Sequence, residues 1–322
     1  MPLFTWARLF RYDRPNRAGG VAVAMLGDGF AIAQYRGAES TSGSGLPHIA
    51  HHPCTALDRP RLLAQAIAEL GASGADARLV LAAGDFRMLQ TSRPEVPEDE
   101  LREALRWRIQ DMLDFAVTEA EIEYFPMPSP RQAASGELLT VLACRTDLIR
   151  EYSELCEAAG LQLGVIDIPE MALRNLGTRL PENARGVALL SLQRERGMLQ
   201  LQRGGDIYIS RELNVGSVPF ETDRAGMGSH DRESALERLA LEVQRSLDYY
   251  ESYYGQSPVA GLVVTPIASG TQQLVDGLNR SLGLISRAMD LSALLSLERM
   301  DDALQQACLP AVGAALRQEA GA

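Results

Sequence analysis

Short apolar stretches separated by turn residues dominate the first eighty positions. Residues 21–25 form an apolar run, and after the turn Gly27-Asp28-Gly29 the apolar side chains of Phe30, Ile32 and Tyr35 recur at short intervals. An Asp-Gly turn between two such runs predicts a β-hairpin. The following positions predict a Gly- and Ser-rich loop, a third strand, a helix and a fourth strand, at residues 37–45, 46–50, 59–70 and 78–82.

The same opening recurs near the middle of the chain. Three strands separated by tight turns are predicted at residues 187–192, 198–202 and 207–211. This internal duplication is the strongest architectural signal in the sequence. The order βββαβ opens the ribonuclease-H-like unit on which actin-like proteins are built. We therefore expect an α/β fold of two actin-like lobes.

An amphipathic helix is predicted between the two repeats, over residues 97–112. Pro97 and the three acidic residues behind it suit the positive end of the helix dipole. A stripe that we expect to be buried is formed by Leu101, Leu105, Ile109 and Met112. Trp107 falls on the opposite side, among acidic residues. It either contacts a partner or is covered by a second layer of the same domain.

The remaining pattern predicts the other strands and helices of the two lobes. Strands are predicted at 121–127, 137–144, 161–168, 261–265 and 284–286, and helices at 148–156, 169–176, 236–254, 270–282 and 301–317, the last on both sides of Pro310. Gly160 is expected at the C′ position of its helix. The expected organisation is an N-terminal basic segment (1–17), a first lobe (18–180) with an insert at about 85–160, a second lobe (181–300), and a C-terminal helix (301–322) that returns to the first lobe.

Composition narrows the possible functions. The chain has 322 residues, of which 46% are hydrophobic, and a formal net charge of -11. Nucleic-acid binders usually carry a basic surplus, so nucleic acid is not an expected partner. All 31 basic residues are arginine. The absence of lysine excludes a P-loop, a Schiff base and kinase-type lysine chemistry.

The cysteines and histidines give only a weak indication of a metal or catalytic site. The four cysteines are scattered and form no CxxC pair, which excludes a disulfide framework and a zinc ribbon. His48, His51, His52 and Cys54 lie close together in what reads as a surface loop. They could ligate a metal or activate the thiol, but the usual spacing of zinc ligands is absent and only one thiol contributes, and solvated side chains explain them as well. We expect no bound metal and no catalytic residue.

The sequence predicts a cytoplasmic protein. No apolar run approaches the roughly 18–20 residues of a membrane span, and no signal peptide is recognisable. Residues 4–17 are basic and amphipathic, with Arg8, Arg11, Arg14 and Arg17 among apolar side chains. This segment either lies on a membrane surface or is a frayed terminus.

Several segments resemble the PilM family of type IV pilus assembly, and more closely its MshI branch of MSHA pilus biogenesis. They cover roughly the last two-thirds of the chain: ELREALRW at 100–107, AEIEY at 120–124, AGL at 159–161, SRELNVG at 210–216, EVQRSLDYY at 242–250 and AVGAALR at 311–317. The resemblance implies an actin-like ATPase fold with a 1C-type insert. It also implies binding of the N-terminal cytoplasmic tail of a bitopic inner-membrane protein of the PilN kind, and in many members ATP binding between the lobes.

The sequence departs from the family at the three loops that would hold ATP. The first strand has only alanines where the family has an aspartate, and Asp28 lies a few residues after that position, in the turn. Ser191 and Gln193 stand where the second hairpin has an aspartate and a glycine, and Pro266 interrupts the third, glycine-rich turn. The vestigial nucleotide loops comprise Gly27, Asp28, Gly29, Gln193, Arg194, Gly197, Ser269 and Gly270. Arg194 and Arg196 could still hold phosphates.

The resemblance therefore implies a scaffold rather than an enzyme. We expect a non-catalytic protein, without bound ATP or Mg²⁺, at the inner face of the inner membrane. Its insert would bind the tail of the PilN-like partner, and a pilus motor ATPase is a further possible partner. The partner-binding candidates are Trp107, Asp111, Phe115 and Tyr124. The alternatives are a nucleotide-binding actin-like ATPase of the same machinery and, more remotely, a sugar-kinase-like enzyme, against which the missing aspartates count equally.

Overall fold

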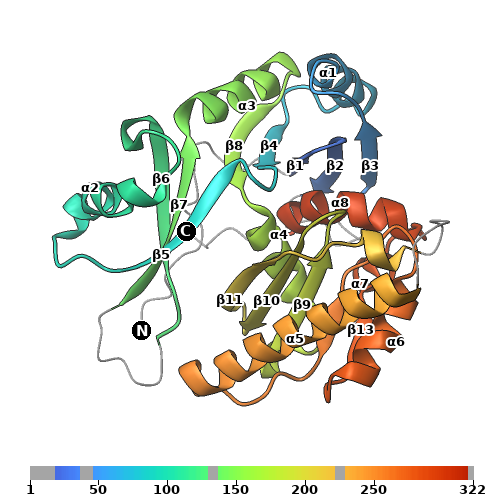
Figure 1. Ribbon diagram of the computed structural model, residues 1–322. Helices are drawn as coiled ribbons and strands as arrows, with labels where there is room; N and C mark the ends of the chain where they lie inside the picture. Colours follow the sequence, from blue (N-terminus) through green and yellow to red (C-terminus); the bar gives the residue numbers. More distant parts are fainter. Residues whose placement is uncertain (1–18, 37–45, 130–136, 222–228, 318–322) are drawn as a thin grey trace. The chain divides into compact units, whose positions relative to one another are not determined.

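The computed structural model describes residues 19–36, 46–129, 137–221 and 229–317. The chain forms two compact units (Figure 1). It leaves the first unit after Ala172, inside helix α4 (Pro169–Gly177), and returns to it at Pro310, inside helix α8 (Asp302–Ala315). The basic segment 1–17 and the loop 37–45 lie outside the described residues. None of the described helices is long and apolar enough to cross a membrane.

The first unit contains a five-stranded sheet in the order β3-β2-β1-β4-β8. Its strands are β1 (Gly19–Leu26), β2 (Gly29–Arg36), β3 (His48–Pro53), β4 (Asp76–Val80) and β8 (Gln162–Asp167). The first three form an antiparallel meander, and β4 and β8 run parallel to β1. Two helices that contact each other accompany this sheet, α1 (Arg59–Glu69) and α3 (Thr146–Ala158). Gly160 ends α3 with a φ of +81°, as expected for a C′ glycine.

The last turn of α8 is fixed in the first unit by a buried arginine. The Nη1 of Arg78, on β4, donates to the carbonyl oxygens of Ala314, Ala315 and Arg317, each at 3.1 Å. Its guanidinium also lies over the ring of Tyr35, 4.2 Å from the centroid. The last carbonyls of a helix have no N–H partner within the helix, so Arg78 supplies a donor at this end. The carbonyl of Ala314 also accepts the N–H of Arg317, at 3.1 Å.

A second, three-stranded antiparallel sheet belongs to the same unit, in the order β5-β7-β6. Its elements are β5 (Phe86–Ser92), α2 (Glu98–Ile109), the 3-10 turns η2 (Gln110–Met112) and η3 (Val117–Glu119), β6 (Ala120–Pro126) and β7 (Leu138–Arg145). Leu101, Leu105 and Ile109 of α2 are fully buried, in one cluster with apolar side chains of β6 and β7. The amphipathic pattern thus places α2 against one face of this sheet.

The second unit repeats the topology of the first sheet, in the order β11-β10-β9-β12-β13. Its elements are η4 (Asn183–Arg185), β9 (Val187–Leu192), β10 (Gly197–Arg203), β11 (Asp206–Leu213), η5 (Val218–Phe220), α5 (Ser229–Tyr254), β12 (Leu262–Val264), α6 (Thr271–Ser281), β13 (Ser286–Ala288) and α7 (Leu291–Leu295). An antiparallel meander is again extended by two parallel strands. The predicted duplication is confirmed.

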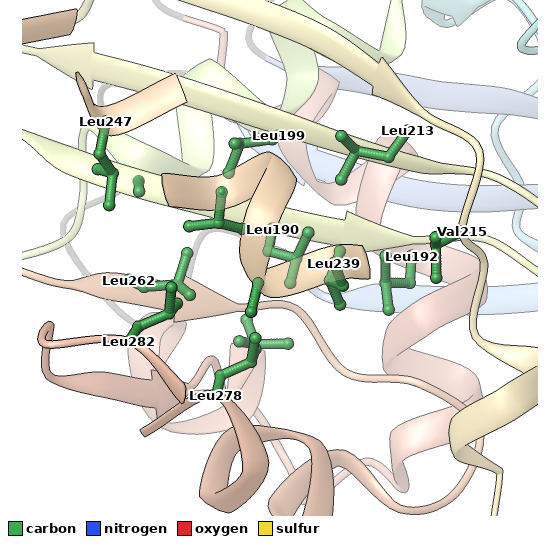
Figure 2. Packing of buried hydrophobic residues seen from close by; sticks show 14 of the residues in the cluster. Leu190, Leu192, Leu199, Leu213, Val215, Leu239, Leu247, Leu262, Leu278 and Leu282 are labelled. Carbon is green, nitrogen blue, oxygen red and sulfur yellow. The ribbon is translucent and has the colours of Figure 1, made fainter. Parts of the chain in front are cut away.

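The core of the second unit lies between its sheet and the helices α5 and α6. Figure 2 shows leucines of the strands and of both helices converging in this layer. The labelled members are Leu190, Leu192, Leu199, Leu213, Val215, Leu239, Leu247, Leu262, Leu278 and Leu282. The predicted stripe of the long helix is confirmed, since Leu239, Val243 and Tyr250 are fully buried in this cluster.

Two expectations were wrong. Met112 is 54% exposed, although it was expected in the buried stripe of α2. The α-helix gives way at Gln110 to a 3-10 turn, whose tighter winding carries Met112 off the stripe, and Leu113 packs against the cluster in its place. The histidines His48, His51 and His52 lie in strand β3 and not in a loop, because pairing with β2 continues as far as Pro53.

Candidate functional site

The β1–β2 hairpin, the first predicted nucleotide loop, ends in a two-residue turn. Leu26 pairs with Gly29, and Gly27 and Asp28 connect them. A side chain at Gly29 would lie 2.2 Å from the carbonyl oxygen of His52, so this position needs glycine. The Asp28 side chain is 71% exposed, with one oxygen 3.9 Å from Nε2 of His51. Inside β1 the expected aspartate position offers only buried alanines.

The histidines of β3 are divided between the two faces of the strand. His48 and His52 share one face of the strand and His51 lies on the other, because successive side chains alternate. Among the described residues, no group of three His, Cys, Asp or Glu side chains could hold a metal ion. The ring of His52 stacks on Phe30 at 4.9 Å. Burial lowers the pKa of His52, and the nearby His48 and His51 lower it further.

The β9–β10 hairpin, the second predicted loop, has a four-residue turn. The N–H of Gln193 donates to the carbonyl of Arg196 at 2.8 Å and closes the turn. Ser191, at the position of the family's aspartate, is buried. Arg196 forms an ion pair with Glu212. Of the two arginines expected to hold phosphates, Arg196 is thus already neutralised.

Arg194 lies instead in a pocket of about 370 Å³ in the second unit. The pocket is lined by Arg194, Glu195, Asn214, Val215, Gly216, Val218, Pro219 and Arg238. A side chain on Gly216 would lie 2.2 Å from the carbonyl oxygen of Arg194, so these two lining segments touch through their backbones. The guanidiniums of Arg194 and Arg238 make no ion pair with any described residue. Arg238 was not predicted, because it comes from α5, far away in sequence.

The third predicted loop, after β12, is closed by internal hydrogen bonds. Thr265 donates its N–H to the carbonyl of Leu190 at 2.8 Å, and Ile267 donates its N–H to Oγ1 of Thr271 at 3.1 Å. Thr271 Oγ1 in turn lies 2.7 Å from a carboxylate oxygen of Asp302. Gly270 has a φ of +87° directly before α6. The N–H groups of Thr265 and Ile267 are therefore already used within the unit.

The outer face of α2 carries the most exposed aromatic side chain of the described residues. Trp107 is 56% exposed, so no second layer formed by the described residues covers it. Glu103 lies four residues before it on α2, which places its carboxylate next to the indole on the helix surface. Asp111 follows four residues after Trp107, in the 3-10 turn η2. Trp107 and Asp111 thus remain a candidate surface, at the junction of α2 and η2.

Phe115 and Tyr124 do not join that surface. Both are partly buried and pack against the apolar cluster beneath α2. The guanidinium of Arg145 lies 5.6 Å from the Phe115 ring centroid. The Tyr124 hydroxyl donates to Glu98 Oε1 at 3.0 Å, and burial, together with this bond, raises the pKa of Tyr124. These two aromatic residues stabilise the insert, while Trp107 faces solvent.

No protein-family model and no curated protein matches the chain. Its structure is similar to one described as a PilM–PilN type IV pilus biogenesis complex, with a TM-score of 0.64 and 20% sequence identity, covering 94% of this chain and 98% of that one. The chain has the actin-like fold.

Two further structures resemble this actin-like chain at lower TM-scores. One is the cytoplasmic domain of EpsL, an inner membrane component of the type II secretion system of Vibrio cholerae, with 14% identity, a TM-score of 0.47, and coverage of 76% of this chain and 81% of that one. The other is a Bacteroides thetaiotaomicron protein with actin-like ATPase fold, with 15% identity, a TM-score of 0.49, and coverage of 87% and 96%.

Proposed function

We propose that this protein is a non-catalytic scaffold of a type IV pilus assembly machine of the MSHA kind. In this role it acts in the cytoplasm at the inner membrane, where it binds the cytoplasmic tail of a PilN-like membrane protein. The observation that carries the proposal is the similarity in fold, over nearly the whole of both chains, to the PilM–PilN structure. The segments that resemble the PilM and MshI proteins, above all residues 242–250, support the same assignment.

The non-catalytic part of the proposal rests on the chemistry of the loops. Magnesium-dependent phosphoryl transfer needs carboxylates that organise the metal and the attacking water. The relevant positions hold alanines in β1 and buried Ser191 in β9. Asp28 lies at the exposed tip of its turn. Neither hairpin thus offers a carboxylate where the family's mechanism needs one.

A co-purification experiment tests the proposal. The full chain and the complete PilN-like protein of the same bacterium would be co-expressed and extracted in detergent, with a tag on the membrane protein. We expect the chain to co-purify, and to be lost when the cytoplasmic tail of the membrane protein is deleted. Retention without the tail, or no co-purification at all, would contradict the proposed partner.

Nucleotide binding is the second candidate function, favoured by one observation. The pocket with Arg194 and Arg238 offers two guanidiniums to an anion, and its volume of about 370 Å³ lies within the range of small-molecule sites. Glu195, also in the lining, opposes an anion. A rise in melting temperature with ATP that disappears in the Arg238→Gln variant would favour this second function.

A further inference from the structure

We propose that the basic segment 1–17 of this chain packs against the outer face of α2 and the adjoining turn η2. This acidic face consists of Glu100, Glu103, Trp107, Asp111 and Met112. Arginines of the segment lie against the carboxylates, and its apolar side chains cover the indole and the thioether. The contact goes beyond the proposed function and does not depend on it, because it needs no second protein.

The carboxylates of the acidic face are not neutralised by neighbouring arginines. Glu100 and Asp111 make no ion pair with any residue in the described part of the chain. Glu103 lies 3.4 Å from Nε of Arg106, but that guanidinium also donates to two backbone carbonyls. The acidic face therefore carries an excess of negative charge.

The other two arginines of α2 are engaged away from this face. Arg102 donates to the carbonyl of Ile122 and to the carboxylate of Glu123, both on β6. Arg108 donates to the carbonyl of Ser92 at 3.4 Å. Cations that neutralise the acidic face must therefore come from another part of the chain or from a partner.

The same face exposes two large apolar side chains. Trp107 is 56% exposed and Met112 is 54% exposed, and they lie close together in the sequence. Glu100 and Glu103 lie on the same side of α2 as Trp107, two turns and one turn before it. Exposed large apolar side chains that are grouped beside polar groups are typical of a binding surface.

Residues 1–17 have the complementary composition. Four arginines and one aspartate give this segment a net charge of +3, which leaves -14 on the rest of a chain whose total is -11. Phe4, Trp6 and Phe10 supply large apolar side chains in the same segment. Arginine binds carboxylates through charge-assisted hydrogen bonds and is attracted to the face of a tryptophan ring. The segment thus offers both kinds of group that the acidic face lacks.

The segment is long enough to reach the acidic face. It precedes the first described residue, Gly19, at the start of β1, and β1 and α2 belong to the same compact unit. An extended chain spans about 3.3–3.6 Å per residue, so the residues before Gly19 can span about 60 Å. A domain of this size is about 40 Å across. The length of the segment therefore permits the contact within one molecule.

The surface around Leu241, on α5, is the most comparable alternative for the segment. Leu241 is 50% exposed, but Arg238 and Arg245 lie within one turn of it, together with Glu237. Opposite charges balance around this side chain, and the two arginines would repel those of the segment. The acidic face is therefore the better match in charge.

Quenching of tryptophan fluorescence by acrylamide tests the contact. The sequence has two tryptophans, Trp6 and Trp107, so the purified full chain with Trp6→Phe reports on Trp107 alone. This substitution keeps an aromatic ring in the segment. We expect a low quenching constant of Trp107 at low salt and a higher one at high salt, because the screening length falls from about 10 Å at 0.1 M to about 3 Å at 1 M.

Charge reversal tests both sides of the contact in the same Trp6→Phe chain. Arg8→Glu/Arg11→Glu should raise the quenching constant at low salt about twofold, because loss of two exposed ion pairs favours the open form about five- to tenfold. Glu100→Arg/Asp111→Arg should have the same effect. Combining all four substitutions should restore the low value, since the charges are then complementary again.

A matched control reverses two exposed carboxylates of α5, Glu233→Arg/Glu237→Arg, and should leave the quenching constant of Trp107 unchanged. Equal quenching in the parent chain and in the segment variant would overturn the proposed contact. A combined variant that stays as accessible as either double variant would also overturn it. Protection of Trp107 that increases with protein concentration would mean that the segment binds a second copy of the chain, which contradicts an intramolecular contact.

Vesicles of anionic phospholipid distinguish this contact from membrane binding by the same segment. We expect either no binding of the chain to vesicles, or binding that raises the quenching constant of Trp107 because the segment leaves the acidic face. If the chain binds vesicles and Trp107 is equally accessible with and without them, the segment is a membrane anchor only, and the proposed contact is wrong.

Discussion

Replacing Arg78 by Met should destabilise the first unit selectively. Methionine keeps much of the length and apolar character of the side chain but removes the guanidinium. The three carbonyl oxygens at the end of α8 then lose the donor at 3.1 Å that Arg78 supplies. The carbonyl of Ala314 keeps a second donor, the N–H of Arg317 at 3.1 Å. The carbonyls of Ala315 and Arg317 are therefore the acceptors that are mainly affected.

The size of this effect follows from the contacts. Each buried acceptor that loses its donor costs about 1–3 kcal/mol. Loss of the contact with the Tyr35 ring adds about 1–2 kcal/mol at a desolvated site. The apolar methionine recovers part of this, so we expect a loss of about 3–5 kcal/mol. At about 2–4 °C per kcal/mol, the melting temperature of the first unit should fall by about 6–20 °C.

Calorimetry of the full chain is the suitable assay, because it can resolve separate transitions of the two units. The matched control is Arg150→Met, at an exposed arginine of α3 that makes no ion pair with a described residue. It should change the melting temperature by no more than about 1–2 °C. A shift for Arg78→Met as small as that of the control would refute the role assigned to Arg78 in fixing α8.

Three further predictions concern other parts of the molecule. Gly313→Ala should lower the free energy of unfolding by about 1–3 kcal/mol, because the new Cβ would lie 2.2 Å from the carbonyl oxygen of Ala172. The control Gly283→Ala, which has open space around the new Cβ, should leave the free energy of unfolding unchanged. Equal melting temperatures of the two variants would contradict this prediction. The pKa of His52 is lowered in the folded state, so its contribution to the free energy of unfolding should be complete above about pH 6.5 and should be lost as the pH falls below that value. In urea titrations at several pH values, His52→Gln should reduce this pH dependence of the free energy of unfolding. An unchanged pH dependence would contradict the assignment. Millimolar Mg²⁺-ATP should leave the melting temperature unchanged, and a magnesium-dependent rise would favour the nucleotide alternative.

The architecture could be predicted from the sequence because its signals are local. Alternating apolar residues around Gly27 and Asp28 specify the first hairpin, and the same pattern returns at 187–211. The apolar stripe of α5 at helical spacing specifies its buried face. Each of these features depends on residues close together in the chain, and the duplicated sheets that they predict are present.

Other features depend on distant contacts and could not be predicted. Strand β5 has mixed polarity, and it is a strand because it pairs along its whole length with β7, about fifty residues later. The donor role of Arg78 depends on the end of α8, more than 230 residues away. Local spacing placed Trp107 correctly on the outer face of α2, but it failed for Met112, where the helix changes its winding.

Binding of the partner's tail in the presence and absence of ATP tests the central claim most directly. Titration calorimetry would use the full chain and the cytoplasmic tail peptide of the PilN-like protein, with and without millimolar Mg²⁺-ATP, while phosphate release is measured in parallel. A non-catalytic scaffold predicts one saturable binding event whose affinity is the same under both conditions, and no phosphate release above the rate without protein. Absence of tail binding, or ATP-dependent binding accompanied by phosphate release, would contradict the account.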